Sequence, residues 1–235
     1  MRRASTAASN AALPRPVRDA ERTQAAILAA ATQEFARHGL GGARVDRIAA
    51  RAKTNKRMLY YYFGRKDALF LAVLENTYAS IRNAEQQLSM LDVSPVEGIR
   101  RLIHFTWDYY RAHPEFLSLL NSENLHDARH LRRSRQVQAM NSPLIETLAT
   151  VLARGREAGL FRGGVDPLQL YVSIAALSYF YLGNNHTLSA VFGRDLASDA
   201  SRAQRLAHMV DVILGYLRPF EPSRRRARVT TAAVA

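Results

Sequence analysis

The sequence of 235 residues contains no cysteine, which excludes disulfides, thiolate metal sites and cysteine nucleophiles. This absence fits a reducing cytoplasm. No apolar run approaches the roughly 20 residues that a membrane-spanning helix needs, so we expect no membrane segment. Residues 1–18 include the arginines of a signal peptide, but serine, threonine and asparagine interrupt any apolar region. We interpret this stretch as a disordered basic arm.

Motifs that support catalysis are also missing. No P-loop, GxSxG or GxGxxG pattern occurs, and the seven histidines form no cluster with metal-ligand spacing. We therefore expect no metal and no cofactor. An enzyme housed in the chain is a disfavoured hypothesis, because no combination of nucleophile and base is recognisable.

Positive charge is concentrated at the two ends of the chain. The net charge is +13, and residues 1–70 hold 14 Lys+Arg against 5 Asp+Glu. Residues 218–235 hold 5 against 1, whereas the 147 residues between hold 14 of each sign. A basic head and a short basic tail on a neutral body are expected of a polyanion-binding module joined to a segment with another task.

Apolar residues recur at helical spacing along the whole chain, and no alternating pattern competes. The fold class is therefore predicted to be all-α. We expect helices over residues 21–37 (with Asp19 as N-cap and Gly39 at the C-terminal end), 45–52, 55–63, 67–88, 96–111, 114–124, 131–158, 167–185 and 200–217. Three of these helices begin at or next to a proline, at Pro95, Pro114 and Pro167. The first three helices together form a unit of the helix-turn-helix type.

The densest aromatic cluster of the sequence lies within its densest run of positive charge, in RAKTNKRMLYYYFGRKDALF at residues 51–70. A helix in the major groove of DNA must neutralise phosphate, hydrogen-bond to base edges and pack against methyl groups and sugars. Lysine and arginine perform the first two tasks, and tyrosine suits the third. Tyrosines at helical spacing also fill cores, and we expect Tyr62 to be core with Leu59 and Phe63.

The stretch ILAAATQEFARHGLGGARVDRIAARAKTNKRMLYYYFGRKDALFLAVL resembles the N-terminal domain of the TetR family of bacterial transcriptional regulators. The resemblance is carried by A..EF...G, V..IA..A, LYYYF and KDAL, over some fifty residues. It implies a DNA-contact set of Arg44, Asn55, Lys56, Arg57, Met58, Tyr60, Tyr61 and Lys66. In this set Lys66 would contact a phosphate, and Tyr60 and Tyr61 would pack on the backbone or bases.

Four positions depart from the family pattern. Lys53 and Thr54 replace a glycine and a valine in the turn, Tyr62 replaces a common histidine, and Arg65 replaces a serine-like N-cap. A lysine in that turn is strained if its φ is positive. Arg65 gives up a cap but adds a possible phosphate contact.

The neutral body carries weaker signals. Resemblance to the TetR family implies that it dimerises and binds a small effector. A stripe of Leu170, Ile174, Leu177 and Tyr181, together with residues 203–217, suggests an intersubunit four-helix bundle. The aromatic side chains of the stretch 100–116 suggest an effector pocket, and the candidates for ligand contact are Trp107, Tyr110, Asn121 and Tyr171.

These observations divide the chain into a basic arm (1–18), a helix-turn-helix domain (19–65), a helical ligand-binding and dimerisation domain (66–217) and a basic disordered tail (218–235). We expect a homodimeric repressor in the bacterial cytoplasm, which a small organic effector releases from double-stranded operator DNA. The alternative is an architectural or nucleoid-binding protein without sequence preference, for which charge alone would suffice.

Overall fold

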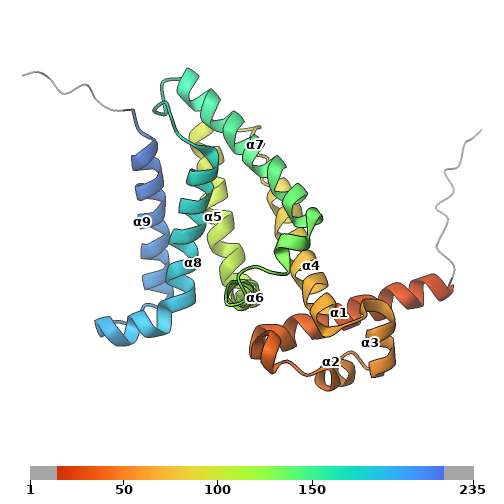
Figure 1. Cartoon of the computed structure of the whole chain (residues 1–235). Helices are drawn as coiled ribbons and strands as arrows, with labels where there is room; N and C mark the ends of the chain where they lie inside the picture. The colour runs from red at the N-terminus through yellow and green to blue at the C-terminus, as the bar shows by residue number, and fades with distance from the viewer. Residues whose placement is uncertain (1–14, 220–235) are drawn as a thin grey trace, which may run out of the picture. The chain divides into compact units, whose positions relative to one another are not determined.

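The computed structural model describes residues 15–219, apart from the side chains of residues 15–18, 141 and 142. All regular structure in this part of the chain is helical, which confirms the all-α prediction (Figure 1). The helices are α1 (Arg15–Gly42), α2 (Val45–Arg51), α3 (Lys56–Phe63), α4 (Lys66–Gln86), α5 (Pro95–Ala112), α6 (Pro114–Asn124), the 3-10 turn η1 (Leu131–Arg133), α7 (Arg135–Glu157), α8 (Pro167–Phe192) and α9 (Asp199–Leu217).

Helix α1 begins earlier than predicted. Residues 15–18, assigned to the arm from the sequence, form its first turn, so Asp19 lies inside the helix and is not its N-cap. Pro16 is compatible with this start, because the first helical N–H groups need no acceptor within the helix. Gly39 interrupts the helical backbone with φ 61°, close to the predicted end. The rest of the predicted arm and all but Arg218 and Pro219 of the predicted tail lie outside the described residues.

Two later helices also differ from prediction. The segment 131–158 is broken at Ser134, which is extended and separates η1 from α7. Helix α8 does not end at Asn185 but continues to Phe192, where Gly193 adopts the left-handed conformation (φ 62°) and its N–H bonds to the Ser189 carbonyl. The predicted end at Asn185 was reasonable, because asparagine often terminates helices. In the structure Asn185 lies inside α8, where it is buried and its carbonyl accepts a hydrogen bond from the Ser189 hydroxyl.

The described part of the chain folds into two compact units, one of residues 15–84 and 109–142 and the other of residues 85–108 and 143–219. In the first unit the helix-turn-helix packs on α4 and α6. Phe35 of α1 meets Phe70 of α4 edge to face at 5.0 Å between ring centroids, and Leu119 of α6 belongs to the same buried cluster. The backbone N–H of Leu40 donates to the Ser122 hydroxyl at 3.2 Å. The compact unit therefore extends beyond the predicted boundary at residue 65, because the short helices share their core with α4 and α6.

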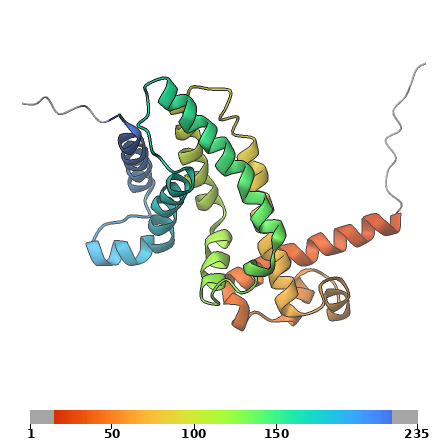
Figure 2. The ribbon, with the colours of Figure 1, turned by 45° about the horizontal axis from the view of Figure 1, so that its top comes forward.

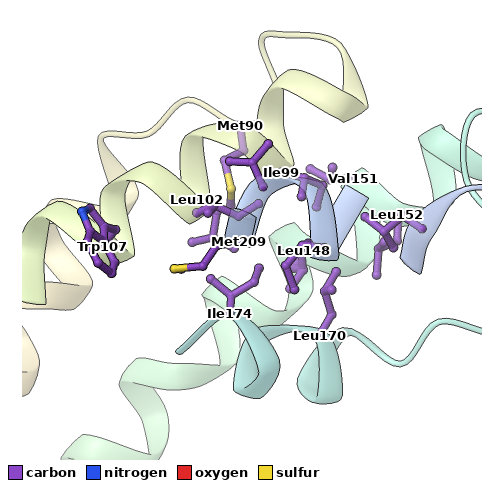
Figure 3. Close-up of a cluster of buried hydrophobic side chains, with 14 of the residues drawn as sticks. Met90, Ile99, Leu102, Trp107, Leu148, Val151, Leu152, Leu170, Ile174 and Met209 are labelled. Atoms are coloured by element: carbon purple, nitrogen blue, oxygen red, sulfur yellow. The ribbon is translucent and has the colours of Figure 1, made fainter. Parts of the chain in front are cut away.

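The second unit has its own apolar core, built from α5, α7, α8 and α9. Figure 3 shows Ile99 and Leu102 of α5, Leu148 and Val151 of α7 and Ile174 of α8 in this core. Trp107 lies at one end of the cluster (Figure 3). Helices α8 and α9 run side by side in both ribbon views (Figures 1 and 2). This core uses the residues of α8 that the sequence analysis assigned to a dimer interface.

Candidate nucleic-acid interface and ligand-binding residues

The turn between α2 and α3 sets the direction of the candidate recognition helix. Lys53 has φ 50°, so it occupies the left-handed region of the backbone. This is the strained conformation expected of a lysine that replaces the glycine usual at this position. The N–H of Thr54 donates to the Ala49 carbonyl at 3.0 Å, which closes the end of α2. Asn55 then caps α3, since its side-chain oxygen accepts the N–H of Met58 at 3.0 Å. Thr54 and Asn55 are both of a type that caps helices, and the structure uses Asn55.

Helix α3 has one face in the core and one face exposed. Leu59 is buried, while Tyr62 and Phe63 are half-buried against the same cluster, as predicted for all three. The predicted DNA-contact residues Lys56, Arg57, Tyr60 and Tyr61 are exposed, and Met58 is half-buried. Tyr60 is 53% exposed and Tyr61 is 76% exposed. The structure therefore presents aromatic rings and cations together on a single surface.

Two of the exposed cations are held in place by acids. Lys56 forms an ion pair with Asp46 of α2, and Arg44 lies 3.9 Å from the same carboxylate. The backbone N–H of Arg44 donates to Oε1 of the buried Glu34 at 3.0 Å. Asp46 thus links the start of α2 to the start of α3, and brings Arg44 and Lys56 to the same side of the head.

Arg47 is a candidate contact that the sequence analysis missed. Its Nε lies 2.7 Å from Glu34 Oε1, its Nη2 donates to the Gly42 carbonyl at 3.0 Å, and its side chain is 45% exposed. The signal for it was present in the sequence. Glu34 precedes the core residue Phe35, and a carboxylate at such a position needs a cationic partner nearby.

Lys66 begins α4, where it was predicted to meet a phosphate. Its Nζ lies 3.4 Å from the Gly41 carbonyl, and the residue is half-buried. It therefore also ties α4 to the turn that follows α1. The neighbouring Arg65 is exposed, and its carbonyl accepts the N–H of Leu69 at 3.0 Å.

The four residues predicted to contact an effector do not share a site inside either unit. Trp107 is buried in the core of the second unit and Tyr171 is half-buried against it. Tyr110 and Asn121 belong to the first unit, where Tyr110 stacks on Phe116 at 5.5 Å and Asn121 is exposed. Trp107 packs beside Tyr181 of α8, at 5.8 Å between ring centroids.

The apolar stripe of α8 serves the chain's own core. Leu170, Ile174 and Tyr181 are buried in it, and Leu177 packs against it. Helix α8 instead exposes Leu168, Val172 and Phe180, and α9 exposes Val212 and Tyr216. A groove between the two helices is lined by Gln169, Leu170, Ser173, Ala176, Leu177, Val212, Ile213 and Tyr216.

Two features are absent from the part of the chain that the structure describes. No group of three or more potential ligands comes close enough to hold a metal ion among residues 15–219. Over the same range, no helix combines the length and the apolar character required to cross a membrane.

Two protein-family models match this chain, one for each part of the architecture. Residues 27–73 match the family model described as bacterial regulatory proteins, tetR family, and residues 95–213 match the tetracyclin repressor-like C-terminal domain. The second match alone spans half of the chain. The chain belongs to the TetR family. It is accordingly a DNA-binding transcriptional regulator and not an enzyme.

Individual relatives match more than four fifths of the chain. The HTH-type transcriptional repressor NicS of Pseudomonas putida is 41% identical over 199 residues, which is 85% of this chain and 94% of NicS. The regulator RutR of Escherichia coli is 28% identical over 194 residues, 83% of this chain and 90% of RutR. Among solved structures, SCO4942 of Streptomyces coelicolor superposes with a TM-score of 0.65 at 29% identity, covering 83% of this chain and 98% of that protein.

Proposed function

We propose that this TetR-family protein is a homodimeric repressor of the bacterial cytoplasm that a small organic effector releases from its operator. The exposed face of α3 carries the proposal. It presents Lys56, Arg57, Tyr60 and Tyr61 to solvent, on a helix whose opposite side is fixed in the core by Leu59. Such a face supplies phosphate neutralisation, base-edge donors and packing surface together. The repressor name of NicS supports the direction of control.

The dimer is supported by the exposed apolar surface of α8 and α9. Leu168, Val172 and Phe180 are each about half exposed on α8, as is Tyr216 on the neighbouring α9. Contiguous apolar surface of this kind marks a protein interface. A second copy of the chain is the occupant that fits, because a twofold interface brings together identical patches and two heads then read two half-sites.

Effector control is supported by the description of the matched C-terminal family model as tetracyclin repressor-like. Of the four residues predicted to contact the effector, Trp107 and Tyr171 lie in the same unit and remain the proposed contact residues, whereas Tyr110 and Asn121 belong to the other unit. For release, the effector must bind the DNA-free conformation more tightly than the DNA-bound one, because equal affinity for both shifts no equilibrium. By reciprocity, saturating operator DNA weakens effector binding by the same factor.

The deciding experiment is selection of DNA by the full-length protein from a random-sequence pool. A repressor enriches a motif with two related half-sites, and binds it at least a thousandfold more tightly than scrambled DNA at physiological salt. An architectural protein enriches no motif, and its affinity for all sequences falls equally with salt. That second result would replace the proposal with the alternative.

A further inference from the structure

A small recess opens at the C-terminal part of α8 and the N-terminal part of α9, within the second unit. It has a volume of about 260 Å³ and is lined by Tyr181, Arg194, Leu196, Ser201, Gln204, Arg205 and His208. This volume lies just below the usual range for small-molecule sites, roughly 300–1,000 Å³. The recess is thus sized for a ligand of few atoms.

Arg205 is the central cation of this recess. Its Nη2 donates to the Leu177 carbonyl at 2.9 Å, and its guanidinium carbon lies 5.4 Å from the centre of the Tyr181 ring. Its Nε is buried and has no hydrogen-bond partner. Burial lowers the pKa of Arg205, and the nearby Tyr181 raises it. A guanidinium carries five N–H donors, so most of this group's capacity is unused.

The recess contains cations without a carboxylate. Among the described residues, neither Arg194 nor Arg205 forms an ion pair, and no lining residue is acidic. The two acids of this region have other partners. Asp195 accepts the N–H of Ala197 at 2.9 Å, and Asp199 lies 3.7 Å from Arg202, which does not line the recess. A partly buried arginine without an anion is the complement of an anionic ligand.

An aromatic surface lies next to the cations. Tyr181 is only 9% exposed, and its hydroxyl is fixed by donation to the Leu196 carbonyl at 2.8 Å. The Trp107 ring lies next to it, at 5.8 Å between ring centroids. The Tyr181 ring therefore has a fixed position, and its small exposed part lines the recess beside Arg205.

We infer that this recess binds a small organic carboxylate, with the carboxylate on Arg205 and Arg194 and the apolar part against Tyr181. Gln204 and His208 supply further polar groups at the recess. Arginine suits a carboxylate because its planar fork offers two parallel N–H donors. Binding of the carboxylate does not require DNA and is independent of the proposed function. Only the role of this ligand as the effector rests on the proposed function.

The other possible source of a carboxylate is an acidic side chain of a second copy. A small ligand is favoured because the guanidinium is engaged with Tyr181 and Leu177 inside a recess, and is not on the exposed apolar surface of Leu168, Val172 and Tyr216. The two sources predict different outcomes when Arg205 is changed.

Benzoate and phenylacetate are the probes, each compared with its neutral amide. Titration calorimetry on the full-length protein without DNA measures binding. The emission of Trp107, the single tryptophan of the chain, reports on the site through Tyr181. We expect at least one of the carboxylates to bind saturably, once per chain, with a change in emission, and its amide to bind at least tenfold more weakly. Absence of saturable binding by both carboxylates would overturn the inference.

Arg205→Gln should reduce carboxylate affinity at least tenfold, and Arg194→Gln, at an exposed residue, should reduce it several-fold without affecting folding. Arg202→Gln is the matched control, because it removes the same charge from the same helix outside the recess. Equal losses in Arg202→Gln and Arg205→Gln would indicate diffuse electrostatics and refute the site. A weakened dimer in Arg205→Gln, without carboxylate binding by the wild type, would assign Arg205 to the second copy.

Operator binding is measured separately, with and without the carboxylate. Release of DNA by a carboxylate that binds through Arg205 would identify it as the effector class. If the protein binds no operator but still binds the carboxylate through Arg205, the repressor proposal fails and the site stands. If operator binding is normal and no carboxylate binds, the site fails and the repressor proposal stands.

Discussion

Nε of Arg47 lies 2.7 Å from Oε1 of Glu34, and the same oxygen accepts the backbone N–H of Arg44 at 3.0 Å. The Glu34 side chain is 1% exposed. Burial raises the pKa of Glu34, but the hydrogen bonds from Arg44 and Arg47 and the charges of Arg47 and His38 outweigh it, so that this pKa lies below its ordinary value of 4.5. One carboxylate therefore fixes both the start of α2 and an exposed arginine beside it.

Glu34→Gln should lower the melting temperature at neutral pH by several degrees. A hydrogen bond to a charged group contributes about 1–3 kcal/mol, and a chain of this size shifts by about 2–4 °C per kcal/mol. Because the folded-state pKa is depressed, the stabilisation is fully present above about pH 4.5 and is lost as the pH falls through the folded value. Calorimetric melting of wild type and variant should therefore converge in acid.

Glu21→Gln is the control for this pH effect, since Glu21 is an exposed acid on the same helix. Its melting curve should follow that of the wild type at both pH values. A difference between Glu34→Gln and wild type that stays constant from about pH 7 to below about pH 4 would show that the Glu34 charge does not stabilise the head.

Tyr61→Ala should weaken operator binding by about tenfold or more while the melting temperature stays within a degree or two. The ring is 76% exposed, so its removal leaves no cavity, although an edge-to-face contact with Tyr62 at 5.0 Å is lost. Gel-shift titration on the selected operator measures the effect. Tyr61→Phe separates the ring from the hydroxyl, and unchanged affinity in the alanine variant would remove Tyr61 from the contact set.

Lys66→Ala should reduce affinity for operator and random DNA about equally. A phosphate contact carries little sequence information, and its loss should reduce the slope of log K against log salt by about one per subunit. The contact of Nζ with the Gly41 carbonyl adds a small loss of stability. Lys66→Gln removes the charge but can retain that contact, so a normal slope in both variants would assign Lys66 a purely structural role.

The sequence was most informative where local chemistry decides the structure. Helix spacing, the capping asparagine and the core position of Leu59 in α3 all follow from short-range pattern, and each agrees with the structure. The resemblance to the TetR family implied DNA contacts for Tyr60 and Tyr61, and both side chains are exposed. The position of Arg47 could not be predicted from local pattern, because it depends on Glu34, which lies thirteen residues earlier on another helix.

The sequence was less informative about tertiary partners. Leu170, Ile174 and Tyr181 were assigned to a dimer interface, but an apolar stripe has the same spacing whether it faces its own chain or another. The structure assigns these residues to the core and leaves Val172 and Phe180 exposed. Similarly, pattern alone could not show that α6 shares a core with α1, since the contact of Leu40 with Ser122 joins residues 82 positions apart.

Lys53→Gly should stabilise the head. A non-glycine residue in the left-handed region costs about 1–2 kcal/mol, and Lys53 has φ 50°. Part of the relieved strain is offset because glycine has greater conformational freedom in the unfolded chain. We therefore expect chemical denaturation to show a net increase of about 0.5–1 kcal/mol in the free energy of unfolding. Lys53→Ala loses the same charge but keeps the strain, and an equal gain in that variant would rule out the backbone explanation.

Val172→Glu should convert the dimer to monomers. Val172 is 48% exposed on α8, so a glutamate there stays hydrated in the monomer but would be buried in the proposed dimer without a partner. Sedimentation measures the change at concentrations where the wild type is dimeric. Leu125→Glu, at a residue that is 84% exposed on the first unit, is the control and should remain dimeric.

Monomers should also lose most of their affinity for an operator with two half-sites centred one helical turn apart, about 34–36 Å, because each head then binds alone. For an isolated half-site the variant and wild-type affinities should agree. A dimeric Val172→Glu protein with normal operator binding would place the interface on another surface.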